Sequence, residues 1–236
     1  MKVVVVIPTY NEAENLEDMA AAIFSLPIPD TSLLIIDDNS PDGTGDIADS
    51  IARINGERFK VVHRQEKLGL GPAYIQGFRE AIDWGAEVIV EMDADFSHDP
   101  KYLTELVEYI QDNDVVVASR YTQGGEADRD WGVSRLMLST FGNLYASLMT
   151  GVKVKDSTSG FKAFRKHVIE SIDFDSFICK GFAFQVEMAY VCQRKGFKIF
   201  EIPVKFTDRR KGKSKINYSI IIEALIKIPM MRLKHL

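Results

Sequence analysis

The most constraining feature of the sequence is a short run of β-branched residues near its start. Val3 to Ile7 is apolar at every position, and the run ends at Pro8. Such a run is too short for a core helix, and its lack of polar alternation is typical of a strand covered on both faces. Strands of this kind occur in parallel sheets with helices on either side. The run therefore predicts an α/β fold.

The rest of the chain repeats this pattern, with strand-like and helix-like segments in alternation. Further apolar runs predict strands at residues 33–36, 60–63, 88–92, 115–118 and 198–206. Apolar residues at helical spacing predict helices at residues 12–26, 43–54, 71–84, 100–111, 133–150, 182–195 and 216–236. Strands joined by helices favour a mostly parallel central sheet with helices on both faces.

Length and composition fit one large domain with a short appendage. The chain has 236 residues, of which 46% are hydrophobic, enough to bury a substantial core. We expect a catalytic domain over residues 1–215 and an amphipathic, basic C-terminal helix over residues 216–236. Cys179 and Cys192 lack metal-binding spacing, so we expect two reduced core thiols in a reducing compartment.

The predicted location is cytoplasmic, on the cytoplasmic face of a membrane or in solution. The N-terminus does not read as a signal peptide, and no stretch reaches the roughly 18 apolar residues of a membrane span. Charge is uneven: residues 205–236 carry a net +7 and the remainder a net −12. This indicates a surface that meets phosphates or anionic lipid, although a solvated basic helix explains the charge equally well.

Polar residues follow four of the predicted strands, where ligands of parallel sheets bind. They occupy residues 9–12, 37–40, 93–95 and 119–120. Single Asp or Asn residues after strands are often helix caps, and Asn11 and Asp99 fit that description. Carboxylates at several strand ends are better explained by a shared ligand site.

Asp93 and Asp95 directly follow a buried strand, and their carboxylates can reach the same side of a turn. Such a pair is suited to Mg²⁺ or Mn²⁺, with open positions for phosphate oxygens and water. The alternative is an Asp pair that caps the helix near Pro100. Asp38 ends the second strand and can accept hydrogen bonds from a nucleobase or ribose. Its neighbour Asp37 should point the opposite way.

Separated basic groups indicate a second phosphate. Arg120 follows a strand, Arg135 lies one helical turn before Ser139, and Arg209 and Lys215 lie in a basic loop. Guanidinium groups bind phosphate through paired hydrogen bonds. One diphosphate and its metal do not require so many cations, whereas a second phosphate-bearing substrate does. For each arginine, a surface salt bridge is the competing interpretation. We expect no nucleic acid partner.

Taken together, these motifs resemble glycosyltransferase family 2, and within it the polyprenol-phosphate (dolichol-phosphate) mannosyltransferases. The likeness covers roughly residues 1–220. Its motifs are Pro8-Thr9-Tyr10-Asn11-Glu12, Asp37-Asp38-Asn39-Ser40-Pro41-Asp42-Gly43-Thr44, Glu91-Met92-Asp93-Ala94-Asp95-Phe96-Ser97-His98, Ser119-Arg120-Tyr121, Ser159-Gly160-Phe161 and Arg209-x-x-Gly212-x-Ser214-Lys215.

The resemblance implies a GT-A-type, Rossmann-like fold that binds a nucleotide-sugar, and it assigns roles by position. The guanosine of GDP-mannose would be held by Pro8, Tyr10, Glu12, Ile36 and Asp38. Its metal-bound diphosphate would be held by Asp93, Ala94 and Asp95, with Arg209 and Lys215 closing over it. The acceptor phosphate would be bound by Arg120, Arg135 and Ser139, which with Asp95 form the catalytic set. The metal would be held by Asp93, Asp95 and Ser97, where Ser97 stands in place of the Gln ligand of some relatives.

The implied reaction is inverting transfer of mannose from GDP-mannose to a polyprenyl (dolichyl-type) phosphate. The family's hydrophobic transmembrane extension is missing, and members without it bind the membrane surface or work with a small membrane-anchoring subunit. Residues 216–236 would then meet lipid, or instead pack on the domain. UDP-glucose as donor and a saccharide as acceptor are alternatives, although the QxxRW motif of processive polymerases is absent.

Overall fold

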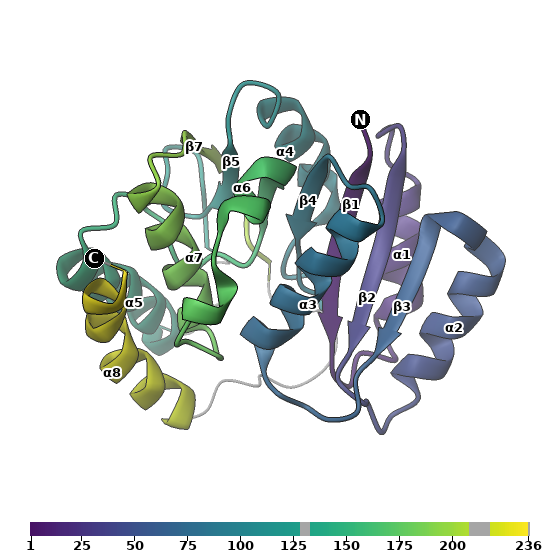
Figure 1. Ribbon diagram of the computed structural model, residues 1–236, viewed down its shortest axis with the longest axis horizontal. Coiled ribbons are helices and arrows are strands. Elements are labelled where there is room, and N and C mark those ends of the chain that lie inside the picture. Colours follow the sequence, from purple (N-terminus) through teal and green to yellow (C-terminus); the bar gives the residue numbers. More distant parts are fainter. Residues whose placement is uncertain (128–132, 208–217, 236) are drawn as a thin grey trace.

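A seven-stranded sheet forms the centre of the molecule (Figure 1). The computed structural model describes the backbone of residues 1–127, 133–207 and 218–235, and the side chains of all of these except 133–138 and 218–220. The strand order is β3-β2-β1-β4-β6-β5-β7. The strands are β1 (Val3–Thr9), β2 (Thr31–Asp37), β3 (Phe59–His63), β4 (Val88–Glu91), β5 (Val115–Ser119), β6 (Lys162–Arg165) and β7 (Ile199–Pro203).

The sheet is parallel except for β6, which runs antiparallel to both of its neighbours, β4 and β5. The remaining pairs, β1 with β2 and β4, β2 with β3, and β5 with β7, are parallel. The mostly parallel sheet is therefore confirmed, but β6 was not predicted. It has only four residues, and two of them are Lys162 and Arg165, so its hydrophobic signal is weak.

Helices lie on both faces of the sheet (Figure 1). They are α1 (Leu16–Phe24), α2 (Thr44–Asn55), α3 (Leu70–Asp83), α4 (Leu103–Tyr109), α5 (Val133–Thr150), α6 (Lys166–Ser171), α7 (Ala183–Arg194) and α8 (Tyr218–Lys234), with short 3₁₀ turns at Gly56–Arg58, Pro100–Tyr102 and Phe174–Ser176. The helix predicted from residue 12 begins only at Leu16, because Glu12 to Asn15 form a turn that belongs to the strand-end loop.

Alternation along each strand divides the core into two layers. On β1, Val4 and Val6 pack with α3 and α7, whereas Val3, Val5 and Ile7 pack with α1 and α4 on the other face. This two-sided burial is the reason that the strand sequence shows no polar alternation. Both cysteines are buried and free, as predicted.

The C-terminal helix α8 packs on the domain, beside α5 and α7 (Figure 1). Ile228 and Met231 are buried in the core, and Glu223 Oε1 accepts a hydrogen bond of 3.0 Å from the backbone N–H of Lys180. The opposite side of α8 is exposed and apolar. Packing on the domain, one of the two expected environments of this helix, is therefore observed, and contact of its exposed face with lipid stays a prediction. Within the described ranges, no helix combines the length and apolarity needed to cross a bilayer.

Candidate active site

The loops after β1 and β2 are joined at the carboxyl edge of the sheet by a cluster of hydrogen bonds. Asp37 Oδ1 accepts from Thr9 Oγ1 at 3.0 Å and from Ser40 Oγ at 2.6 Å. Ser40 Oγ in turn accepts from the backbone N–H of Asn11 at 3.0 Å. Asp37 is thus part of the scaffold of this edge, and its side chain makes different contacts from that of Asp38, as the alternation of strand side chains predicts.

Asp38 forms a buried ion pair with Arg64. Burial raises the pKa of Asp38, and the guanidinium of Arg64 and the backbone N–H of Gly69 oppose that rise. The nearby Tyr10 ring has Lys67 Nζ at 3.7 Å from its centroid. An acid paired in this way presents a fixed carboxylate at the end of β2.

The other residues predicted to contact the nucleotide differ in how far they are exposed and in the hydrogen bonds they make. Pro8 is partly exposed, and Glu12 is buried beside Asn15, whose Nδ2 donates to it at 2.9 Å. The backbone N–H of Glu12 donates to Thr44 Oγ1 at 2.9 Å. Ile36 is fully buried, with its side chain in the core next to α3.

The loop after β4 carries the two predicted metal ligands. Asp95 is buried, and its Oδ1 accepts from the Ser97 backbone N–H at 3.0 Å and from Ser97 Oγ at 2.5 Å. Phe96 has a φ of 62°, in the left-handed region that non-glycine residues seldom occupy. This turn folds Ser97 back onto Asp95. Ala94 between the two acids is buried.

His98 holds the backbone of the loop that carries Asp93 and Asp95, which we call the acidic loop. Its Nδ1 accepts the backbone N–H of Asp93 at 2.9 Å, and burial lowers the pKa of His98 to about 3. The ring is therefore neutral at pH 7 with its proton on Nε2, which lies 3.9 Å from Asp93 Oδ2. It stacks on Phe161 at a centroid separation of 5.1 Å and meets Phe206 edge-on at 4.8 Å.

The residues of this loop fit a hard divalent cation. Asp93 keeps 34% of its side chain exposed, Asp95 lies one residue on, and both supply oxygen ligands of the type that Mg²⁺ and Mn²⁺ prefer. In the described part of the chain, no group of three or more His, Cys, Asp or Glu side chains could hold a metal. A cation bound here would therefore complete its coordination with water and phosphate oxygens.

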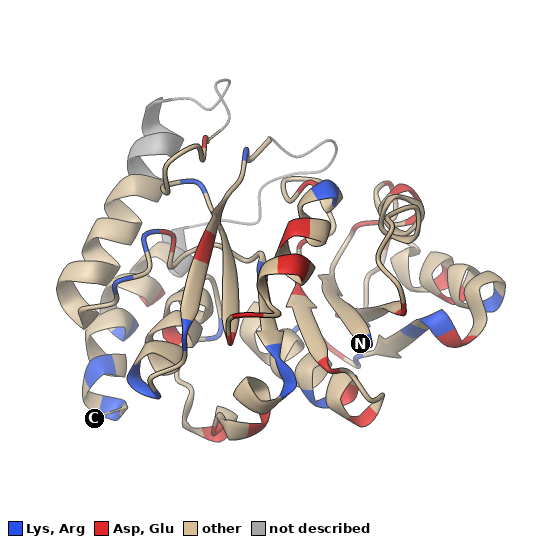
Figure 2. Ribbon diagram, turned by 90° about the horizontal axis from the view of Figure 1, so that it is seen from above, with Lys and Arg blue, Asp and Glu red and all other residues tan. Residues whose placement is uncertain are grey.

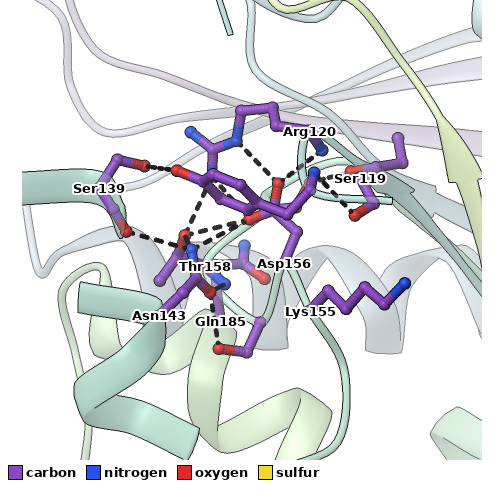
Figure 3. Close-up of polar contacts among 12 residues, drawn as sticks. Ser119, Arg120, Ser139, Asn143, Lys155, Asp156, Thr158 and Gln185 are labelled. Atoms are coloured by element: carbon purple, nitrogen blue, oxygen red, sulfur yellow. Dashed lines mark hydrogen bonds and ion pairs between the residues drawn. The ribbon is translucent and has the colours of Figure 1, made fainter. Parts of the chain in front are cut away.

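Arg120, the basic residue predicted after β5, is held by a buried carboxylate (Figure 3). Its Nε and Nη2 each donate to one oxygen of Asp156 at 2.7 Å, and its backbone N–H donates to Asp156 Oδ2 at 2.9 Å. Nη2 also lies 3.0 Å from Thr158 Oγ1. The guanidinium carbon is 4.7 Å from the centroid of Phe206. Because Phe206 also contacts His98, one aromatic ring lies between the acidic loop and Arg120.

Ser139 on α5 joins the same network (Figure 3). Its hydroxyl accepts from Tyr121 OH at 2.8 Å. One turn further along α5, Asn143 Nδ2 donates to Thr158 Oγ1 at 3.0 Å and its Oδ1 accepts from Ser157 Oγ at 3.0 Å. The helix that carries Ser139 is therefore fastened to the loop that orients Arg120.

The structure brings together Asp93, Asp95, Ser97, Arg120 and Ser139. The side chains of Arg135, Arg209 and Lys215 lie outside the described residues, so their predicted roles stay predictions.

Several residues of the site were not predicted from the sequence, namely Arg64, Asn143, Asp156 and Thr158. A signal existed for three of them. Asp156 and Thr158 belong to a polar run that leads directly into the Ser159-Gly160-Phe161 motif. Asn143 lies one helical turn after Ser139 and so shares its face of α5. Arg64 follows β3 without any distinguishing pattern.

Known proteins resemble this chain in sequence and in fold. The sequence model of the family described as "Glycosyl transferase family 2" matches residues 4–173. A polyprenol monophosphomannose synthase of Mycolicibacterium smegmatis is 40% identical over 228 residues, covering 96% of this chain and 85% of that protein. An undecaprenyl-phosphate mannosyltransferase of Micrococcus luteus is 41% identical over 228 residues, covering 97% of this chain and 93% of that protein.

A solved structure shares the fold at low sequence identity. Glucosyl-3-phosphoglycerate synthase from Mycobacterium tuberculosis, in complex with Mn²⁺ and UDP-glucose, superimposes with a TM-score of 0.68 at 17% identity. The match covers 99% of this chain and 78% of that one. This likeness concerns the fold, whereas the sequence match extends over most of the chain and includes the acidic loop and Arg120. The chain belongs to glycosyl transferase family 2.

Proposed function

We propose that the protein transfers mannose from GDP-mannose to the phosphate of a polyprenol, with inversion at the anomeric carbon. The proposal is supported by the two relatives near 40% identity, whose names specify mannosyl transfer to polyprenol or undecaprenyl phosphate. The observation that carries it is the pairing of an acidic loop with Arg120 across one ring, Phe206. One half suits a metal-bound diphosphate and the other suits a second, anionic substrate.

The expected chemistry requires little proton transfer. An oxygen of the acceptor phosphate is already an anion at neutral pH, so it attacks the anomeric carbon without a general base while the bond from that carbon to GDP breaks. The residues then act by placement: Arg120 and Ser139, together with Arg135, hold the acceptor phosphate in line with the leaving group. Arg209 and Lys215 stabilise the departing diphosphate.

In the donor half, we assign Asp38, with Pro8, Tyr10, Glu12 and the backbone around Ile36, to the guanosine. Asp93, Ala94 and Asp95 are assigned to the diphosphate and its cation, Mg²⁺ or Mn²⁺, which would supply positive charge to the leaving group when bound. Ser97 contributes by orienting Asp95 through its hydroxyl, with any direct bond to the cation as a further role.

We also propose that the protein binds the cytoplasmic face of a membrane through α5 and α8. These helices lie side by side at one end of the molecule (Figure 1), and they carry most of its large exposed apolar side chains, namely Phe141, Leu144, Leu148, Met149, Ile222, Leu225, Ile226, Met230 and Leu233. Basic residues lie at the end of α8 near the C-terminus (Figure 2). An apolar face with basic neighbours is suited to an anionic bilayer surface; a small membrane-anchoring subunit is the alternative occupant.

The decisive experiment compares two labelled donors. Purified protein is incubated with polyprenyl phosphate, Mg²⁺ or Mn²⁺, and either GDP-mannose or UDP-glucose. Label should enter the organic extract from GDP-mannose alone. Label from UDP-glucose alone would identify the other donor, and no transfer from either would contradict the proposal.

The metal assignment is tested by replacing Asp95. The Asp95→Ala variant should lose turnover by at least about a thousandfold, because charge on the leaving diphosphate would no longer be neutralised. Asp99→Ser is the control, since Asp99 caps the turn at Pro100–Tyr102 by accepting from the Lys101 backbone N–H and pairs with the Lys101 ammonium at 2.7 Å. Product formation by Asp95→Ala at the control's rate would overturn the assignment.

A further inference from the structure

A buried polar triad lies beneath the active site and is not used by the chemistry proposed above. Lys162 Nζ donates to Glu91 Oε1 at 2.9 Å, and it also donates to Gln185 Oε1 and to the backbone carbonyl of Ser159. The side chains of Glu91 and Lys162 are at most 1% exposed, and Gln185 is buried as well. The three ammonium hydrogens of Lys162 are thus all used.

The triad connects three separate parts of the fold. Glu91 is the last residue of β4, two residues before Asp93. Lys162 faces it in register on β6, and Ser159 ends the loop that carries Asp156 to Arg120. Gln185 comes from α7 and lies beside this loop in Figure 3. Lys162 is therefore the shared contact of the acidic loop's strand and the loop that orients Arg120.

Holding the sheet together through this triad costs free energy, because charged and polar groups are removed from water. Burial raises the pKa of Glu91, and Lys162 opposes that rise. Gln185 also opposes the rise in the pKa of Glu91. By geometric criteria, Glu91 Oε2 and Gln185 Nε2 have no hydrogen-bond partner among the described residues. Apolar residues of similar size fill such positions with equal or greater stability. Stability alone does not account for these three residues.

We propose that Glu91, Lys162 and Gln185 are positioning residues that fix the distance between the donor half and the acceptor half of the active site. The proposal rests on the proposed transfer between two phosphate-bearing substrates. For such a transfer, a displacement of about 1 Å between the reacting groups costs about a hundredfold in rate, whereas each substrate can still bind to its own half. Loss of the triad is therefore expected to lower kcat and to leave donor affinity nearly unchanged.

The test uses two double variants of similar volume. In Glu91→Leu with Lys162→Met, both charges are removed, so no buried charge is left unpaired and the protein should fold with a melting temperature near that of the wild type. In Glu91→Gln with Gln185→Glu, the same two groups exchange places and Lys162 keeps an amide and a carboxylate as partners. The exchange variant is the matched control.

The expected results separate positioning from stability. The apolar variant should bind GDP with Mn²⁺ within threefold of the wild type and have kcat reduced at least tenfold, while the exchange variant keeps most of its kcat. Wild-type kcat in the apolar variant would overturn the proposal, as would losses of kcat that follow the melting temperature in both variants.

A crystal structure of the apolar variant gives a readout that does not depend on the reaction. Its Ser159 carbonyl and Asp93 backbone should be displaced relative to each other by about 0.5 Å or more, a shift large enough to affect alignment. Unchanged spacing would contradict the proposal even if the wild type proves to use another donor. Absence of any transfer by the wild type would instead contradict the proposed function.

Discussion

Among the individual residues of the site, Asp156 has a role that its position in the sequence does not reveal. It is wholly buried, and the charged partner of its carboxylate among the described residues is Arg120. A carboxylate that pairs with Nε and one Nη fixes the plane of a guanidinium. Removal of Asp156 would leave the charge of Arg120 buried and its direction unconstrained. The arginine predicted to bind phosphate thus depends on an acid that orients it.

Replacement of Asp156 should impair transfer more than binding of the donor. We expect Asp156→Asn to lower kcat/KM for the polyprenyl phosphate by about a hundredfold, because Arg120 loses its fixed orientation, with little change in the affinity for GDP. Steady-state assays with varied acceptor measure the effect. Asp175→Asn is the control, since the side chain of Asp175 is 89% exposed and its ion-pair partner among the described residues is Arg79. Equal kinetics for the two variants would refute this role.

Asp156 should also contribute to acid sensitivity. Its burial favours the neutral form, but Arg120 outweighs burial, so the pKa of Asp156 lies below its ordinary value of 3.8. An acid with a depressed folded pKa stabilises the protein above its unfolded pKa and loses that contribution as pH falls through the folded value. The free energy of unfolding should therefore decline below about pH 5.

Urea unfolding between pH 3 and pH 7 measures this decline. Asp156→Asn, which has no group to titrate at this position, should lose less of its free energy of unfolding over the acid range than the wild type. Identical pH dependence in both proteins would show that this pair makes no contribution.

At the scale of elements, close contact between α3 and β1 is permitted by a glycine. A Cβ at Gly77 would lie 2.3 Å from Cγ1 of Val6, and Val6 is a β-branched residue with little freedom to move. This contact brings α3 against the strand whose loop begins the donor half of the site.

Alanine at two helical glycines should have opposite effects. Gly77→Ala should lower the free energy of unfolding by about 1–3 kcal/mol, because the methyl group overpacks the core. Gly142→Ala, on α5, meets no atom within 4 Å and should raise it by about 0.5–1 kcal/mol through helix propensity. Urea titrations of both variants measure the difference; a stabilised Gly77→Ala would contradict the packing argument.

The sequence was informative about elements whose signal is local. The strand Val3–Thr9 could be predicted because burial on both faces makes its first five residues apolar without a break, and the long helix Leu70–Asp83 because burial of one face gives its residues a helical period. The strand Lys162–Arg165 could not, since its first residue is a lysine that is neutralised by Glu91, which is 71 residues away in the sequence. The same limit applies to the site. Asp93 and Asp95 lie together in the chain, whereas the pairing of Arg120 with Asp156 exists only in the folded molecule.

At the scale of the whole molecule, most of the large exposed apolar side chains of the described residues lie at the end formed by α5 and α8. Leu148 and Ile226 are more than half exposed there, and Ile54 is similarly exposed on α2 at the opposite end (Figure 1).

This asymmetry predicts how the protein meets a bilayer. Replacing both Leu148 and Ile226 by Asp should weaken binding to vesicles of anionic phospholipid at least tenfold in a sedimentation assay, because charge is costly to bury at the apolar boundary. Ile54→Asp should bind like the wild type. Equal weakening by both changes would contradict an oriented surface. Failure of the wild type to bind lipid, with recovery on addition of a small membrane protein, would assign the same face to a subunit.

The reversed direction of β6 has a further consequence for how this architecture can diversify. An antiparallel strand begins at the edge where its parallel neighbours end, so the chain leaves β5 and returns through β6 on the same side. Everything assigned to the acceptor, from Arg120 through α5 to Ser159, is one continuous stretch of sequence. The residues assigned to guanosine and to the acidic loop come from β1, β2 and β4, outside that stretch. If the proposed assignment holds, exchanging residues 120–161 between relatives should transfer lipid preference while the donor stays the same.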